Sequence, residues 1–305
     1  MTTQEIWQDC ISKIVNNPSR VLVIGESTTG KTSFVTYLAQ MGCKKGIKTA
    51  VLDMDVGQSN IGPPTTIGWG FAPQNMNSLF DIKPEQIYFI GNTSPLGKER
   101  EFATGIKKIL PKAKEAKLLI VESVAFFKDR DFRDKMLALE IEIIKPDYIV
   151  VLKLGAPYKE NLLSEGGKVF SLPGVIKKSK RNLLHRKKFR IESWWRYLKE
   201  GKVYHFPNSF QEKTIGGGLA NSSEEAISCS SFLIGSVVGI TDSKGYHLAA
   251  GVIFDTDKEN ISVFAPSVRA TERDNLSFIK GEVKVEGRVL TLIKEKVNET
   301  GCLSV

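Results

Sequence analysis

The sequence has few features of a secreted or membrane protein. It contains four cysteines that are far apart in the chain: Cys10, Cys43, Cys229 and Cys302. Because no two of them form a C-x-x-C pair, we expect free thiols in a reducing compartment and no zinc site. The first ten residues lack the apolar core of a signal peptide, and no apolar run approaches the length of a membrane span. These absences predict a soluble cytoplasmic protein, nuclear if eukaryotic, with no membrane partner.

The sequence also lacks internal repeats and low-complexity segments. At 305 residues it is long enough for one large domain or two modest ones, with a sizeable core. The formal net charge of +9 fits a polyanionic partner such as a nucleic acid. A solvated, lysine-rich surface gives the same excess, so charge alone leaves both interpretations open.

A phosphate-binding motif lies near the start of the chain. Residues 25–32, GESTTGKT, match G-x-x-x-x-G-K-[ST]. A predicted buried strand precedes the motif, a predicted helix follows it, and a second buried strand spans Thr49 to Leu52. We expect the loop N–H groups to bind phosphate, Lys31 to reach the β- and γ-phosphates, and the Thr32 hydroxyl to ligate Mg²⁺. The predicted nucleotide-binding residues are Gly25, Glu26, Ser27, Thr28, Thr29, Gly30, Lys31, Thr32 and Ser33.

Two carboxylates stand at the end of the second strand, Asp53 and Asp55. Side chains at i and i+2 point to the same side of a strand, which here is close to the bound phosphates. A carboxylate at this place can hold Mg²⁺ through water or accept a proton from an attacking hydroxyl. The alternative is an acidic residue that caps a turn, and it fits Asp53 better than Asp55.

The residues around these acids resemble a known kinase family. Residues 53–68, DMDVGQSNIGPPTTIG, are similar to the second-strand signature of the polynucleotide 5′-hydroxyl kinases. These P-loop RNA and DNA kinases include the kinase-like subunit of messenger-RNA cleavage factor and a ribosomal-RNA-processing kinase. The resemblance implies that Asp55 is the catalytic carboxylate with a role at the metal. It also implies that Gln58 is a polar partner near the metal, the phosphates and the nucleic acid.

A second segment with this resemblance follows the predicted strand Ile87 to Ile90. Residues 91–95, GNTSP, are similar to the family's G-x-T-S-P segment. The resemblance implies that Thr93 positions the acceptor end of the nucleic acid. Glycine and proline also bracket a tight turn at a strand end, where α/β proteins place ligand contacts. The alternative is a plain turn in which Thr93 and Ser94 cap a helix that begins near Lys98.

The next predicted strand, Leu118 to Val121, ends in a departure from the family pattern. Members usually carry Asp or Asn, then Thr-x-Gly-aromatic, whereas this chain has ESVAF at residues 122–126. Phe126 falls where the family often has a tryptophan that stacks on a nucleobase, a contact that tolerates many sequences. A plain core position is the alternative for Phe126.

The densest basic run, KKSKRNLLHRKKFR, spans residues 177–190. It resembles the arginine-rich lid of the family, which implies an arginine that neutralises charge on the transferring phosphoryl group. Arg186 and Arg190 are the preferred candidates for this catalytic arginine, Arg181 is a third, and His185 is interpreted as a bystander. Three further cations are expected to hold the nucleic-acid backbone: Lys178, Lys180 and Arg181. The alternative is a solvated basic face.

From about Ser230 the sequence changes to short apolar runs separated by turn signals, which predicts a small all-β module. Two more strands are predicted between Ile279 and Leu290. The predicted fold class is therefore α/β: a P-loop NTPase with a mainly parallel sheet flanked by helices, plus a small C-terminal all-β domain. Residues 1–225 are the predicted kinase domain, with its lid at about 175–200, and residues 226–305 the β domain.

These motifs, with a resemblance that runs from Arg20 to about Leu290, imply an ATP- and Mg²⁺-dependent kinase. It would phosphorylate the 5′-hydroxyl end of RNA or DNA, and the resemblance also implies RNA-processing protein partners. One alternative is a catalytically silent nucleotide-binding scaffold of an RNA-processing complex. Another is a metallochaperone-type GTPase, but its base-specifying Asn/Thr-Lys-x-Asp motif is only faintly matched at residues 153–155.

Overall fold

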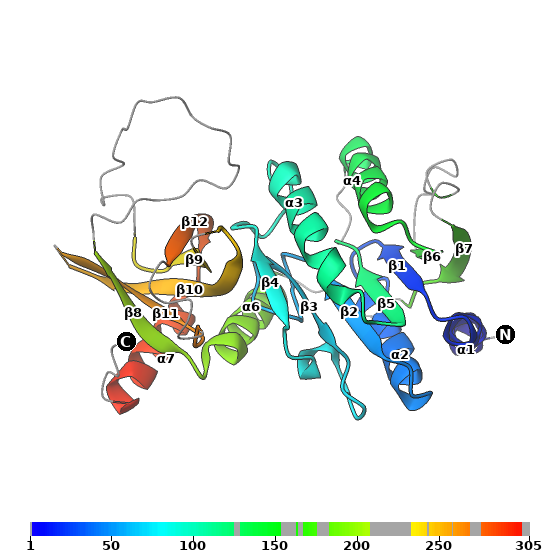
Figure 1. Cartoon of the computed structure of the whole chain (residues 1–305), viewed down its shortest axis with the longest axis horizontal. Helices are drawn as coiled ribbons and strands as arrows, with labels where there is room; N and C mark the ends of the chain where they lie inside the picture. Colours follow the sequence, from blue (N-terminus) through cyan, green and yellow to red (C-terminus); the bar gives the residue numbers. More distant parts are fainter. Residues whose placement is uncertain are drawn as a thin grey trace.

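The helices and strands that the structure describes are arranged around two separate sheets (Figure 1). The computed structural model describes residues 2–124, 129–153, 163, 167–175, 183–207, 233–242, 244–257, 259–268 and 276–300. The larger sheet lies towards the N-terminal helix, and the smaller sheet lies at the other end of the molecule.

The larger sheet has seven strands in the order β4-β3-β2-β5-β1-β6-β7. Their bounds are β1 (Arg20–Gly25), β2 (Thr49–Asp53), β3 (Thr66–Phe71), β4 (Gln86–Phe89), β5 (Leu118–Glu122), β6 (Tyr148–Lys153) and β7 (Lys168–Pro173). The pairings among β2, β5, β1, β6 and β7 are parallel, whereas β3 is antiparallel to both of its neighbours. The predicted mainly parallel sheet is confirmed.

Helices cover both faces of the larger sheet, which explains why its central strands are continuous apolar runs. On one face, α1 (Thr3–Asn16) and α2 (Lys31–Lys44) pack through a core that includes Trp7 and Phe34. On the other face, α3 (Glu99–Ile109) and α4 (Arg130–Ile144) pack through a core that includes Phe102 and Met136. None of the helices in the described part of the chain is long and apolar enough to cross a membrane.

The smaller sheet is antiparallel and has the order β12-β9-β10-β11-β8. Its strands are β8 (Lys202–Pro207), β9 (Ser236–Thr241), β10 (His247–Thr256), β11 (Asn260–Ala265) and β12 (Ser277–Lys284). Strand β8 pairs with β11, so the second sheet begins before the predicted boundary at residues 225–226. The separate β sheet was predicted and is confirmed, whereas the boundary between the two domains stays a prediction.

The second strand predicted within Ile279 to Leu290 is a helix instead. Helix α7 spans Gly287–Thr300 and follows β12. Its side chains Val289 and Ile293 are both buried, at the i, i+4 spacing that places residues on one face of a helix. The C-terminal part is therefore an antiparallel sheet with one helix packed against it, and the predicted separate β domain is confirmed.

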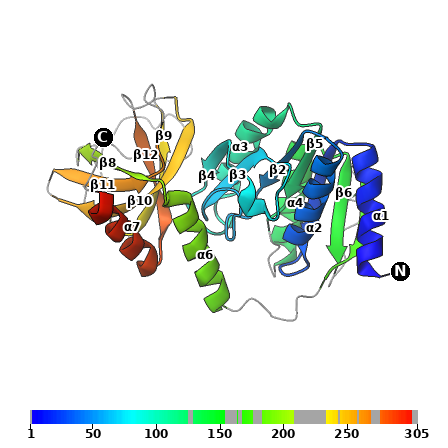
Figure 2. The same ribbon diagram turned by 90° about the horizontal axis from the view of Figure 1, so that it is seen from below.

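Helix α6 (Leu183–Leu198) lies between the two sheets in both ribbon views (Figure 2). Its residues Trp194 and Leu198 are buried in the core of the smaller sheet. On the other side, the Phe189 ring lies 5.6 Å from the Phe80 ring, and the Arg196 guanidinium lies 3.6 Å from the same ring. Phe80 belongs to the short 3₁₀ helix η1 (Leu79–Asp81) of the larger sheet's half. Contacts on two faces thus fix α6 above the carboxyl ends of the parallel strands.

Candidate active site

The phosphate-binding motif forms the loop between β1 and α2. Gly30 adopts the left-handed conformation, with φ of 94°, and a Cβ there would lie 3.2 Å from the Trp7 ring. At Gly25 a Cβ would lie 2.6 Å from the Thr29 hydroxyl oxygen. Both positions therefore need glycine. Because Gly30 is the N-cap, no side chain caps α2, and its first N–H groups are directed towards the loop.

A cavity of about 420 Å³ lies above this loop. Six of the predicted nucleotide-binding residues line it: Ser27, Thr28, Gly30, Lys31, Thr32 and Ser33. Gly25, Glu26 and Thr29 shape the loop, since the Thr29 hydroxyl donates to the Glu26 carbonyl at 2.9 Å. Lys31 is buried, and its Nζ donates to the Gly25 carbonyl at 2.9 Å. The lysine is thus held at the floor of the cavity, where a phosphate can replace the carbonyl.

The two strand-end aspartates have different surroundings. Asp53 is fully buried and accepts hydrogen bonds from the N–H groups of Asp55, Asn60 and Ile61 at 3.0, 2.6 and 3.3 Å. Burial, followed by the nearby Asp55, raises the pKa of Asp53. Its carboxylate therefore holds the loop that follows β2, which favours the turn-capping alternative for this residue.

Asp55 lines the cavity, as Gln58 does. Its Oδ1 accepts hydrogen bonds from the N–H groups of Gly57 at 3.1 Å and Gln58 at 3.0 Å. These two bonds fix the carboxylate and leave its second oxygen for a ligand or a proton. The structure brings Asp55 and Gln58 to the same cavity as the P-loop residues.

Glu122 is a site residue to which the sequence analysis gave no role beyond its place in the departure at residues 122–126. It ends β5 directly beside Asp53 in the parallel pairing, and its Oε1 accepts a hydrogen bond from the Thr32 hydroxyl at 2.7 Å. It lines the cavity, although it is almost entirely buried. Burial and then the Asp53 charge raise the pKa of Glu122, against the opposing effect of Lys31. Its place at the end of a strand next to the P-loop strand was the sequence feature that could have identified it as a site residue.

The oxygen atoms around this point suit Mg²⁺. The Thr32 hydroxyl and the carboxylates of Asp55 and Glu122 are hard oxygen donors, which this ion prefers. Glu122 Oε2 is buried and has no hydrogen-bond partner within the described ranges. An orphaned carboxylate oxygen beside a hydroxyl is what a cation, or one of its waters, would satisfy. The donor set therefore fits the predicted metal.

A second buried carboxylate supports the end of β5. Glu140 of α4 is fully buried and accepts a hydrogen bond from the Ser123 hydroxyl at 2.7 Å. Burial raises the pKa of Glu140 to about 8. The carboxyl therefore favours its protonated form and ties the residue after Glu122 to the helix behind it.

Thr93 lies in a second, smaller hollow of about 160 Å³ between the two halves of the molecule. Arg190, Trp194 and Lys284 line the same hollow. The capping alternative for Thr93 and Ser94 is wrong, because Lys98 is the N-cap of α3 and no side chain caps that helix. The structure thus brings Thr93 and Arg190 together, but not in the P-loop cavity itself.

Helix α6 presents a different set of residues to the P-loop cavity: His185, Lys188, Phe189 and Glu192. Neither Arg186 nor Arg190 is among the described residues that line it. The two arginines are one turn apart on the face that also carries Trp194, which packs on the smaller sheet. His185 was interpreted as a bystander, yet it lines the cavity. Phe126, Lys178, Lys180 and Arg181 lie outside the described residues, as do Leu154 and Gly155.

The sequence matches one family model, described as the mRNA cleavage and polyadenylation factor CLP1 P-loop, over residues 25–200. It is 32% identical over 244 residues to polyribonucleotide 5′-hydroxyl-kinase MJ1315 of Methanocaldococcus jannaschii, covering 77% of this chain and 66% of that protein. It is 30% identical over 224 residues to polyribonucleotide 5′-hydroxyl-kinase PH0197 of Pyrococcus horikoshii, covering 68% of this chain and 60% of that protein. The chain thus spans less than two thirds of these curated relatives.

A solved structure shares the fold. The wild-type Clp1p–Pcf11p (454–563) complex contains a chain that superposes with a TM-score of 0.73 at 15% identity. The match covers 93% of this chain and 79% of the other. The superposition therefore includes both sheets of the present molecule.

Proposed function

The chain belongs to the CLP1 P-loop family, and we propose that it is a kinase that transfers the γ-phosphate of ATP to the 5′-hydroxyl of a polynucleotide. The named activity of the archaeal relatives supports this proposal. The observation that carries it is the P-loop cavity, which Lys31, Thr32 and Asp55 line together.

The P-loop residues would bind the triphosphate. Backbone N–H groups at the start of α2 would donate hydrogen bonds to the phosphate oxygens. Lys31 would release its hydrogen bond to the Gly25 carbonyl and bind the β- and γ-phosphate oxygens instead. The Thr32 hydroxyl and the Glu122 carboxylate would hold Mg²⁺, directly or through water. When bound, this ion supplies charge neutralisation on the phosphate oxygens.

Asp55 is the group placed to act on the acceptor. Its carboxylate is fixed by two N–H groups and lines the cavity, so it can accept the proton of an attacking hydroxyl. Glu122 is poorly suited to that step, because it is almost entirely buried and its Oε1 already accepts a hydrogen bond from the Thr32 hydroxyl. We therefore assign proton acceptance to Asp55 and metal holding to Glu122.

The acceptor would approach from the side of the second hollow. Thr93 and Arg190 line it, and the predicted backbone contacts Lys178, Lys180 and Arg181 precede α6 in the chain. Lys188 also lines the P-loop cavity and adds a second cation to Lys31. A polyanionic substrate fits this distribution of charge. RNA-processing partners and a cytoplasmic location remain predictions.

One assay tests the proposal against the silent-scaffold alternative. The protein would be incubated with γ-labelled ATP, Mg²⁺, and matched RNA and DNA oligonucleotides that carry either a 5′-hydroxyl or a 5′-phosphate. We expect label to be transferred to the 5′-hydroxyl ends only, and to be lost in Lys31→Ala. ATP binding without transfer to either nucleic acid would instead identify a scaffold.

A further inference from the structure

The smaller sheet makes a specific contact with the turn that carries Thr93. The Glu282 N–H, in β12, donates to the Gly91 carbonyl at 2.7 Å. The side chain of Glu282 accepts a hydrogen bond from Asn92 Nδ2 at 2.8 Å and pairs with Lys98 Nζ at 2.5 Å. One residue of the smaller sheet therefore holds the segment 91–98 at its first, second and last positions.

Two glycines allow this close approach. Gly91 has φ of +81°, and a Cβ there would lie 3.1 Å from the Gly281 Cα. A Cβ on Gly281 would lie 3.0 Å from the Gly91 carbonyl oxygen and 2.5 Å from Val237 Cγ2. The backbone of β12 thus touches the backbone of the turn, and a side chain at either position would separate them.

The turn is in direct contact with the Asp55 loop on its other side. A Cβ on Gly57 would lie 2.9 Å from the Thr93 carbonyl oxygen and 3.4 Å from Asp55 Oδ1. There is consequently no free space between the Thr93 backbone and the loop that orients the Asp55 carboxylate. A shift of the turn would have to move that loop, or open a gap beside it.

The ion pair between Glu282 and Lys98 is better suited to holding the turn in place than to stabilising the whole fold. The Glu282 side chain is 54% exposed, and an ion pair of this kind contributes little to the free energy of unfolding. Its partner Lys98 is only 18% exposed, and hydrogen bonding to Glu282 raises the pKa of Lys98. Lys98 lies immediately before α3 and also approaches Glu101 Oε1 at 3.6 Å. The pair therefore fixes where the turn ends and the helix begins.

We propose that Glu282 is a positioning residue for phosphate transfer: it fixes the turn 91–98, and through Thr93 the Asp55 loop. The smaller sheet then forms part of the wall on which the acceptor binds. This inference rests on the proposed kinase function. It assigns to the smaller sheet a role in acceptor binding.

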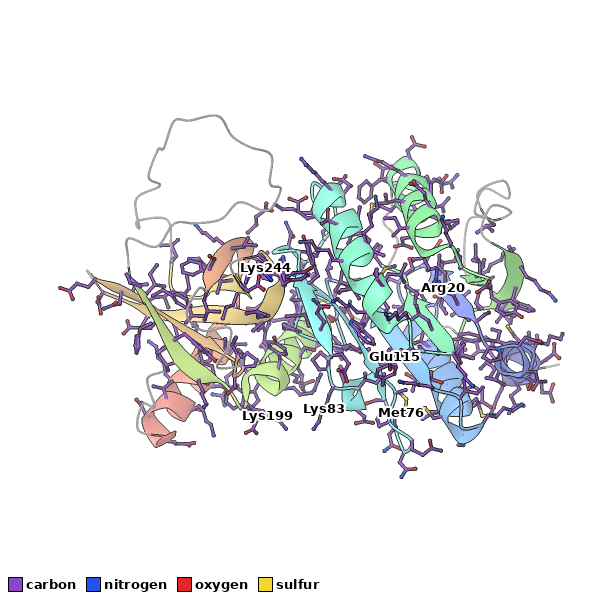
Figure 3. All side chains as sticks on the ribbon, in the orientation of Figure 1. Arg20, Met76, Lys83, Glu115, Lys199 and Lys244 are labelled. Carbon is purple, nitrogen blue, oxygen red and sulfur yellow. The ribbon has the colours of Figure 1, made fainter. Side chains whose placement is uncertain are left out.

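The first test compares Glu282→Ala and Glu282→Gln in the full chain. We expect Glu282→Ala to raise the KM for a 5′-hydroxyl oligonucleotide by about fivefold, at the low end of couplings between sites. The KM for ATP should not change. Glu282→Gln should recover part of the loss, because its amide oxygen can still accept from Asn92. Glu115→Ala is the matched control, since Glu115 pairs with Lys48 on the larger sheet's half, away from the smaller sheet (Figure 3).

A second pair of variants tests the mechanism. Lys98→Ala should raise the same KM, and its effect should not add to that of Glu282→Ala, because one interaction is lost in both. Gly281→Ala should raise this KM more strongly, because the added methyl group would displace the backbone of the turn. A wild-type KM in Glu282→Ala would overturn the proposal. So would an equal loss for ATP and oligonucleotide together with a lowered Tm, because that pattern indicates general destabilisation.

Hydrogen exchange separates this inference from the proposed function. In Glu282→Ala, the amides of residues 92–98 should exchange faster, with no change in Tm. This measurement does not need catalysis, so a wild-type protein that fails to transfer phosphate would refute only the kinase function. Unchanged exchange in residues 92–98 would refute the positioning role even if the kinase is active.

Discussion

The Thr32 hydroxyl donates a hydrogen bond of 2.7 Å to the Glu122 carboxylate, which joins the start of α2 to the end of β5. This contact explains how the chain tolerates its departure from the Asp/Asn-Thr pattern of related kinases. Glutamate is one methylene longer than aspartate, but it still places a carboxylate oxygen at the P-loop threonine. A carboxylate oxygen therefore lies at the P-loop threonine in this chain.

Glu122→Gln should keep the Thr32 hydrogen bond and remove the negative charge. We expect the Mg²⁺ concentration needed for half-maximal activity to rise about tenfold, the low end of the effect of residues that support a metal ligand. The measurement is a Mg²⁺ titration of phosphate transfer at saturating ATP. An unchanged Mg²⁺ dependence would exclude Glu122 from the metal site. Glu115→Gln is the control for the loss of one carboxylate.

Asp55→Asn should separate binding from chemistry. The amide oxygen can still accept from Gly57 and Gln58, so the loop and ATP affinity should be retained. Turnover should fall by at least ~10²-fold, the typical effect of losing a positioned acid or base. Lys31→Ala should instead weaken ATP binding and abolish transfer. Near-normal turnover in Asp55→Asn would reject the assignment of proton acceptance.

The arginines of α6 provide a third prediction. If one of them neutralises charge in the transition state, Arg186→Ala or Arg190→Ala should lower kcat by at least ~10³-fold at saturating substrates. Because neither lines the P-loop cavity, α6 would have to turn or shift when substrates bind. Lys188→Ala is the informative comparison, since Lys188 already lines the cavity. A loss of kcat confined to Lys188→Ala would mean that Lys188 neutralises the transition-state charge and that α6 does not need to shift.

Glu140 predicts a pH dependence of stability. Its pKa is raised from 4.5 to about 8 in the folded protein, so the folded state retains a proton that the unfolded state releases. The associated stability is fully present below the unfolded pKa and is lost as the pH rises towards 8. Glu140→Gln, which resembles the protonated acid, should lose less stability than the wild type between pH 5 and pH 8. Parallel denaturation curves for the two proteins across that range would contradict the assignment.

Local patterns predicted a loop and a strand end that the structure brings to one cavity, whereas the roles of these residues stay predictions. The glycines and Lys31 follow from the motif, and Asp55 follows from its place at a strand end near the phosphates. The contacts of Asp53 with the loop after β2 and of Glu122 with Thr32 were not predictable, because they depend on the pairing of β2 with β5. Asp53 holds the loop because the N–H groups of Asp55, Asn60 and Ile61 reach its carboxylate.

The faces of α6 and the extent of the smaller sheet were beyond local reasoning. The basic run has cations on several sides of the helix, so the sequence does not say which of them point to the cavity. The packing of Trp194 on the smaller sheet decides which side of α6 faces the cavity. Strand β8 was missed for the same reason, since its partner β11 lies more than fifty residues further along the chain.

The smaller sheet covers the edge strand β4, and this affects which fragments of the protein can be produced. The Phe89 N–H donates to His247 Nδ1 at 3.0 Å, and the His247 ring stacks on Tyr88 with 4.0 Å between ring centroids. The histidine thereby occupies a backbone donor that an edge strand would otherwise offer to a strand of another molecule. A polypeptide that stops before β9 would leave this donor open. We expect such a fragment to self-associate, so the larger sheet should be produced only together with the smaller one.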